Sequence, residues 1–185
     1  MSQGYLNLII GPMFSGKSTR LIQYIRKYKT LGLNLIVIKP SLDTRYTTKN
    51  EICTHNHEKE SCNIYDRDKL EEIFNHSEYN NYEIIIIEEG QFFMNLFEIV
   101  KRMTDIDKKK VYISALNGDF NRDLFGDIHK LISLADNIDF LQSLCIDCKD
   151  GTPGIYSKRI TNNSLQILVA SNDNYKAVCR KHYFL

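Results

Sequence analysis

The chain has 185 residues, 43% of them hydrophobic, and a formal net charge of +1 at pH 7. This length suits one domain, or one domain with a small appendage, and the near-neutral charge argues against a strongly basic nucleic-acid surface. The amino terminus lacks a basic stretch followed by an apolar core, and no apolar run is long enough to cross a bilayer, so we expect a soluble, intracellular protein.

Strand-like and helix-like segments alternate over the first two-thirds of the chain. Strands are predicted over 5–10, 34–38, 83–87 and 110–115, helices over 17–30, 68–74 and 92–103, and a polar, irregular segment over 41–64. The strands are continuously apolar, which is typical of a parallel sheet covered on both faces. We therefore predict an α/β fold with a parallel sheet and flanking helices.

A glycine-containing loop lies between the first predicted strand and the first predicted helix. It fits the P-loop pattern of glycine, four residues and Gly-Lys-Ser: Gly11, Pro12, Met13, Phe14, Ser15, Gly16, Lys17 and Ser18. Its backbone N–H groups and the helix N-terminus would hold ATP phosphates, Lys17 would contact the β- and γ-phosphates, and Ser18 would offer a hydroxyl to Mg²⁺. The alternative is a chance glycine turn, but strand, spacing, Lys-Ser and helix all coincide here.

Two carboxylates, Glu88 and Glu89, follow the run of four isoleucines at 84–87. In doubly wound sheets ligands bind beyond the carboxyl ends of the strands, so one carboxylate could hold the Mg²⁺ shell while its neighbour faces the acceptor. Taken alone, the pair reads as a solvated strand end. The P-loop in the same chain favours a functional role for the pair over a solvated strand end, with Glu88 as the Mg²⁺-associated residue.

The sequence pattern changes near residue 141, where short predicted segments and paired cysteines indicate a small second module. Cys145 and Cys148 are spaced like Cys179 and His182, and two such chelating pairs are typical of a closed, structural zinc site. A redox dithiol or buried thiols are the alternatives. The remaining cysteines, with the histidines near them, are more simply read as unligated and as part of a polar loop: Cys53, Cys62, His55 and His57.

Several segments together resemble the zinc-containing thymidine kinases of the cellular and poxviral type. The similar segments span nearly the whole chain: the P-loop with its Pro-Met-Phe insert, 39–46, 53–55, 89–93, 115–120 with 125–126, 156–159 and 175–182. The resemblance implies ATP-dependent phosphorylation of the thymidine 5′-hydroxyl, with Glu89 as the general base. It also implies a lasso loop in the C-terminal module that closes over thymine mainly through backbone hydrogen bonds.

The resemblance extends to the remaining site residues and partners. The expected nucleoside-binding residues are Asp43, Arg45, Phe92, Leu116, Phe120, Phe125, Gln166, Ile167, Leu168, Val169, Ala170 and Tyr175. ATP with Mg²⁺, one structural Zn²⁺ per chain, feedback inhibition by dTTP, a homotetramer and a cytoplasmic location (the host cytoplasm if the chain is viral) are also implied. We expect no nucleic-acid partner and no membrane association.

These observations predict a P-loop ATP-binding α/β domain over 1–140 and a zinc-ribbon-like module with the lasso over 141–185. Two other classes of function stay open at this point. A nucleic-acid-binding ATPase would need a basic face with exposed aromatic residues, which the near-neutral charge disfavours. A non-catalytic nucleotide switch would lack a base beside the acceptor, and Glu89 argues against it.

Overall fold

The computed structural model describes residues 3–43, 50–54, 58–167 and 174–185. Its centre is a sheet of six strands in the order β5-β2-β6-β7-β1-β8, in which every neighbouring pair is parallel. The strands are β1 (Tyr5–Gly11), β2 (Leu35–Pro40), β5 (Asn63–Tyr65), β6 (Ile84–Ile87), β7 (Lys110–Leu116) and β8 (Asn137–Phe140). The predicted α/β fold with a parallel sheet is confirmed.

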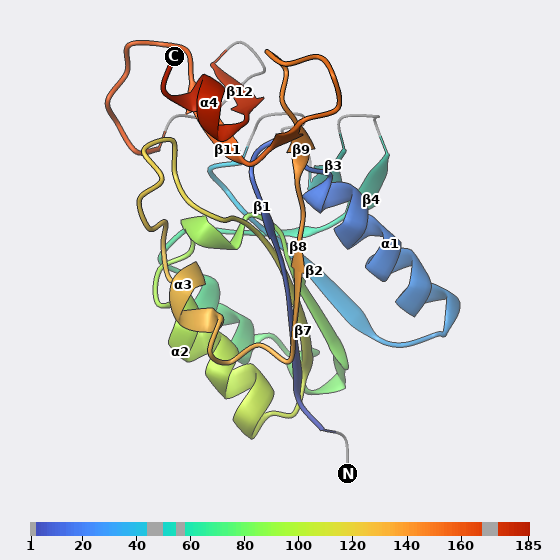
Figure 1. Ribbon diagram of the computed structural model, residues 1–185. Helices are drawn as coiled ribbons and strands as arrows, with labels where there is room; N and C mark the ends of the chain where they lie inside the picture. The colour runs from blue at the N-terminus through green and yellow to red at the C-terminus, as the bar shows by residue number, and fades with distance from the viewer. Residues whose placement is uncertain (1–2, 44–49, 55–57, 168–173) are drawn as a thin grey trace.

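Helices cover both faces of this sheet (Figure 1). Helix α1 (Lys17–Thr30) lies on one face, and α2 (Leu96–Lys101) and α3 (Ile128–Leu131) lie on the other. Strand β6 shows why its four isoleucines are all buried: Ile84 and Ile86 pack on the α1 side, whereas their neighbours in sequence pack on the α2 side. A strand buried on both faces reads as a continuous apolar run.

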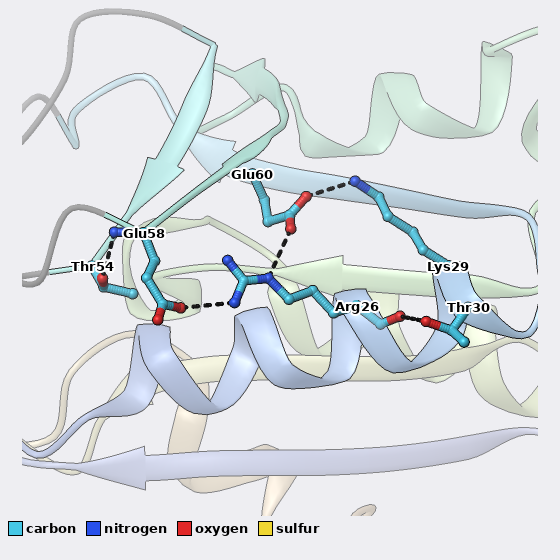
Figure 2. Close-up of polar contacts among 6 residues, drawn as sticks. All are labelled: Arg26, Lys29, Thr30, Thr54, Glu58 and Glu60. Carbon is cyan, nitrogen blue, oxygen red and sulfur yellow. Dashed lines mark hydrogen bonds and ion pairs between the residues drawn. The ribbon is translucent and has the colours of Figure 1, made fainter.

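The polar segment that was expected to be irregular contains three strands. A hairpin of β3 (Glu51–Cys53) and β4 (Lys59–Ser61) precedes β5, which joins the main sheet. Ile52 is fully buried against the α1 layer, and its register partner Glu60 lies on the same side of the hairpin. Glu60 and the neighbouring Glu58 pair with Arg26 of α1 (Figure 2), whereas Glu51 and Lys59 pair with each other. The charges that suggested a loop are thus paired with α1 or with each other across the hairpin.

Two predicted helices also differ from the structure. Residues Leu70–Asn75 form a 3₁₀ helix, η1, followed by a second, η2 (Tyr79–Asn81). The helix expected over 92–103 begins only at Leu96, after a 3₁₀ turn, η3 (Gly90–Phe92), and ends in a π-helical turn, η4 (Arg102–Ile106). Phe93 is buried in the core, and the N–H of Met94 donates to the carbonyl of Arg67, which holds this stretch outside the helix.

The C-terminal elements lie beyond the carboxyl ends of the sheet strands, at the top of Figure 1. They are β9 (Ser143–Leu144), β10 (Pro153–Gly154), β11 (Tyr156–Arg159), β12 (Tyr175–Val178) and α4 (Arg180–Tyr183). The pairs β9–β10 and β11–β12 are both antiparallel. Among the described residues, no helix has both the length and the apolar character that a membrane span requires.

Candidate functional site

The predicted phosphate loop connects β1 to the first residue of α1, which is Lys17. Two glycines are needed for its path: Gly16 has a φ of 83°, and a Cβ on Gly11 would lie 2.4 Å from the carbonyl oxygen of Leu141. The carbonyl of Pro12 accepts hydrogen bonds from Lys17 Nζ at 2.7 Å and from Ser15 Oγ at 2.8 Å. The lysine is therefore folded over the loop, close to where phosphate oxygens would bind.

The same loop is bound to the C-terminal elements. The backbone N–H of Met13 donates to Ser157 Oγ at 2.8 Å, and this contact is buried. The Met13 side chain packs with Tyr175, Leu116 and Phe120. Met13 thus belongs at once to the phosphate loop and to the apolar cluster that faces the C-terminal strands.

The two carboxylates at the end of β6 are both buried, with exposed fractions of 2% for Glu88 and 4% for Glu89. Glu89 has a left-handed backbone with φ of 52°, an uncommon conformation for a residue with a side chain. Gln91 Nε2 donates to Glu89 Oε2 at 2.5 Å, and Gln91 Oε1 accepts from the N–H of Leu116 at 3.2 Å. The Leu116 bond fixes which end of the amide faces the carboxylate, so Gln91 orients Glu89.

A pocket lies between the phosphate loop, the end of β6 and the C-terminal strands. Its lining residues are Met13, Leu42, Asp43, Glu89, Phe92, Leu116, Asp119, Phe120, Phe125, Ser157, Gln166, Ile167 and Tyr175. The rings of Phe92 and Phe125 meet edge to face, with centroids 5.4 Å apart. An apolar pocket with a few convergent polar groups is the form that small-molecule sites take.

Eight of the expected nucleoside-binding residues line this pocket together with Glu89: Asp43, Phe92, Leu116, Phe120, Phe125, Gln166, Ile167 and Tyr175. The other four lie outside the described residues: Arg45, Leu168, Val169 and Ala170. Glu88 is not among the lining residues of the pocket. Of the two carboxylates, only that of Glu89 lines the pocket.

Several polar residues of the site were not singled out from the sequence. Asp119 accepts from the N–H groups of Asn121 and Asp123 through Oδ1 and from Gln166 Nε2 through Oδ2, the last at 2.8 Å. Ser157 and Arg159 are the buried positions of β11, whose burial alternates along the strand. Both lie in the segment 156–159 noted for its resemblance, but the sequence of so short a strand does not show which residues face inward.

Cys145, Cys148, Cys179 and His182 form one cluster, with ligand atoms all within 4.8 Å of one another. The distance from Cys148 Sγ to Cys179 Sγ is 3.7 Å, and the three sulfur atoms lie 3.2–3.5 Å from His182 Nδ1. A tetrahedral zinc site has S–S edges of about 3.8 Å and S–N edges of about 3.6 Å. The donor set and its spacing therefore fit zinc.

The thiols of this cluster differ in acidity. Burial favours the neutral thiol of Cys145, but hydrogen bonds from the backbone of Cys179, Cys148 and Asp147 outweigh it and lower the pKa to about 6. Burial and the neighbouring thiols raise the pKa of Cys148 to about 11. The thiolate is the form of cysteine that binds a metal ion.

The other cysteines lie apart from this cluster. Cys62 is buried, and burial raises the pKa of its thiol to about 12, which makes it unreactive. Cys53 is also buried, and its Sγ donates to the carbonyl of Thr54. Within the described residues neither thiol belongs to a metal-binding group. His55 and His57 lie outside the described residues.

The chain is similar to known proteins over nearly its whole length. A sequence profile of the thymidine kinase family matches residues 4–183. The thymidine kinases of sheeppox virus (strain KS-1) and rabbit fibroma virus (strain Kasza) are each 39% identical to this chain, covering 100% of it and 99% and 98% of their own lengths. The thymidine kinase of vaccinia virus (strain Western Reserve) is 36% identical over 99% of this chain and 98% of its own length.

These matches confirm the resemblance that the motifs indicated. They extend over nearly all of this chain and nearly all of each relative. The chain belongs to the thymidine kinase family.

Proposed function

We propose that this chain transfers the γ-phosphoryl group of ATP to the 5′-hydroxyl of thymidine, giving dTMP and ADP for the salvage of deoxynucleosides. Kinases of this family use ATP and a divalent metal. The observation that carries the proposal is the position of Glu89, which lines an apolar pocket that also reaches Met13 of the phosphate loop. An acceptor hydroxyl at Glu89 would lie beside the phosphates.

We assign the chemistry to the residues as follows. Glu89 takes the proton of the 5′-hydroxyl while that oxygen forms a bond to the γ-phosphorus and the bond to the ADP oxygen breaks. Gln91 orients the carboxylate of Glu89, and Lys17 places a positive charge at the transferred phosphoryl group. Mg²⁺, when bound, neutralises the phosphate oxygens, and Ser18 and Glu88 would hold it. The positioning of the groups matters more here than the strength of the base.

The pocket residues would bind the nucleoside, with the phenylalanines against the base and Gln166 to Ala170 and Tyr175 closing over it. We propose that backbone groups of this segment read the thymine edge. A base with the opposite donor and acceptor pattern leaves buried groups unpaired, so deoxycytidine should be a far poorer substrate than thymidine. Deoxyuridine lacks only a methyl group and should be disfavoured by at most about 10–200-fold.

Further properties belong to the same proposal. Residues 1–140 would form the ATP-binding domain and 141–185 the zinc module with its lasso. The cluster at Cys145, Cys148, Cys179 and His182 would hold one structural zinc per chain. By analogy with the family we also propose a homotetramer, feedback inhibition by dTTP and a cytoplasmic location, that of the host if the chain is viral.

The test is transfer of radiolabelled γ-phosphate across a panel of nucleosides, with and without added DNA. Glu89→Gln keeps the shape of the side chain but cannot accept the proton, and turnover should fall by about 10²–10⁴-fold while ATP still binds. Glu83→Gln is the matched control, because this carboxylate lies at the other end of β6 and bonds only to the N–H of Asn34 among the described residues. Near-wild-type turnover of Glu89→Gln, or ATP turnover that depends on DNA, would contradict the proposal.

A further inference from the structure

Arg159 stands where the chain leaves β11 for the loop that closes the pocket. It is the register partner of Tyr175, the first residue of β12, and the next residue, Ile160, donates its N–H to the carbonyl of Asn174 at 3.0 Å. We call residues 160–167 the flap segment. Arg159 therefore lies at the point where this loop is joined to the rest of the protein.

Arg159 is 9% exposed, and its guanidinium uses all five of its N–H donors. Nη1 donates to the carbonyls of Asn163, at 2.7 Å, and Leu165, and Nη2 donates to the carbonyl of Gln166 at 3.3 Å. Nε, at 3.0 Å, and Nη2 both donate to the hydroxyl of Tyr175. One side chain thus fixes three carbonyls of the flap segment and the ring of Tyr175.

The flat face of the same guanidinium contacts a third part of the pocket wall. Cζ of Arg159 lies 3.6 Å from the centre of the Phe120 ring, a distance at which a cation is attracted to the ring. Phe120, Tyr175 and Gln166 all line the pocket, whereas Arg159 is not among its lining residues. Arg159 lies behind the wall of the pocket and holds its parts together.

A second contact attaches the flap segment on its other side. The side-chain amide of Gln166 donates to Asp119 Oδ2 at 2.8 Å and to the carbonyl of Leu124 at 3.3 Å. Asp119 directly precedes Phe120 in the chain. The flap segment is therefore attached to the Phe120 region through Gln166 and to both C-terminal strands through Arg159.

We propose that Arg159 is the positioning residue of the nucleoside pocket, which holds the flap segment, Tyr175 and Phe120 in the arrangement that binds the nucleoside. This inference rests on the proposed thymidine kinase function. Lysine could not take over the role, because its three donors diverge from one atom and it lacks a planar face for the ring. Substitution of Arg159 should therefore weaken nucleoside binding rather than slow the chemical step, because Arg159 contacts the pocket wall and not Glu89.

The first experiment compares steady-state kinetics of Arg159→Met, Arg159→Lys and a matched control, Arg122→Lys. Arg122 also lies over aromatic rings, with Cζ 4.5 Å from the Tyr183 ring centre, but the described residues show no hydrogen bond from it to the flap segment. For Arg159→Met we expect KM for thymidine to rise by about 10–100-fold while kcat and KM for ATP stay within about threefold. Arg159→Lys should lie between Arg159→Met and the wild type, and Arg122→Lys should resemble the wild type.

The second experiment does not depend on activity. Thermolysin cleaves before large apolar residues, and Leu165 in the flap segment is 65% exposed. Without any nucleoside, Arg159→Met should be cut at Leu165 at least about 10-fold faster than the wild type, since losing its anchor shifts the segment toward open, cleavable states. Arg122→Lys should be cut at the wild-type rate.

The two experiments separate failure of the inference from failure of the proposed function. A wild type that does not phosphorylate thymidine refutes the function, and the cleavage rates then still decide whether Arg159 holds the flap segment. Unchanged cleavage at Leu165 in Arg159→Met overturns the inference. So does a parallel rise of both KM values together with a lower melting temperature, which would show a general structural defect.

Discussion

The backbone N–H of Met13, in the phosphate loop, donates to Ser157 Oγ in β11 at 2.8 Å. This bond joins the predicted ATP site directly to the strand that leads into the flap segment. Since Met13 and Ser157 both line the pocket, we expect movement on the nucleoside side to be transmitted to the loop that would hold the phosphates. The two substrates should therefore bind cooperatively.

Ser157→Ala should reduce this cooperativity, because it leaves a buried N–H without its acceptor. In the wild type we expect a non-hydrolysable ATP analogue to raise thymidine affinity by at least about fivefold, and in the variant this factor should fall toward one. Calorimetric titration of thymidine with and without the analogue measures it. Ser143→Ala, in β9, is the control, and an unchanged factor in Ser157→Ala would show that the contact is not the link.

Gln91→Met should lower kcat by about 10–100-fold with little change in the KM of either substrate, because the Glu89 carboxylate would lose the hydrogen-bond donor that orients it. Gln91→Glu should be more severe, since it places a second carboxylate against Glu89. Single-turnover measurements separate the chemical step from product release. If Gln91→Met turned over like the wild type, Glu89 would not need this contact.

Lys17→Ala should be inactive, with weaker binding of the triphosphate or a misplaced γ-phosphate. Lys27→Ala provides the control, because it removes a lysine from the exposed last turn of the same helix. Turnover and ATP affinity are measured separately. A folded Lys17→Ala protein with normal catalysis would rule out the phosphate-loop assignment.

Removal of zinc should impair nucleoside binding before it disturbs ATP binding. Tyr183, next to the predicted ligand His182, donates its hydroxyl to the carbonyl of Phe120 at 2.8 Å, so the metal cluster is connected to the pocket wall. Elemental analysis of untagged protein should give one zinc per chain, and Cys148→Ser should lose it and raise KM for thymidine. Cys53→Ser keeps a hydrogen-bond donor for the carbonyl of Thr54. This variant should retain its zinc and the wild-type KM for thymidine. A metal-free protein that stays folded and fully active would disprove the role of the cluster.

The hairpin β3–β4 is held on α1 by ion pairs that should respond to salt. Glu60 accepts from Arg26 at 3.3 Å and from Lys29 at 2.6 Å, and Glu58 pairs with Arg26 at 3.0 Å (Figure 2). Glu60→Gln should lower the free energy of unfolding by about 0.2–1 kcal/mol at low salt, because both cations are half exposed. In 1 M salt, where charges are screened within about 3 Å, the difference should vanish.

Urea unfolding at the two salt concentrations measures this effect. Glu58→Gln is the comparison variant and should lose less, since its carboxylate is more exposed than that of Glu60 and contacts only Arg26 among the described residues. If the free energy of unfolding of Glu60→Gln stayed below that of the wild type in 1 M salt, the stabilisation by Glu60 would not be electrostatic.

The parts of the fold that local pattern determines were predictable from the sequence. Helix α1 has the predicted bounds because its apolar residues repeat at helical spacing between Gly16 and Gly32. Strand β6 was evident from four consecutive isoleucines. The cluster of Cys145, Cys148, Cys179 and His182 was predictable because its two pairs share a spacing that is typical of zinc sites.

Features that depend on distant partners were not predictable. The charges of β3 and β4 resemble a loop until α1 supplies their counterions. The helix after β6 starts late because Phe93 is drawn into the core. Arg159 and Ser157 look like ordinary surface residues of a short strand, and only the folded chain brings Phe120 and Met13 against them.

The order of the strands in the sheet has a consequence for synthesis on the ribosome. Strand β1 is the first element made, yet its two neighbours are β7 and β8, so that Tyr5 pairs with Lys110 and Asn7 with Asn137. The nascent phosphate loop thus has no framework until most of the chain has left the exit tunnel. Such non-local pairing slows folding and leaves apolar strands exposed meanwhile. A chain interrupted before β7 should be a target for chaperones and proteases, and functional ATP binding should appear only late in translation.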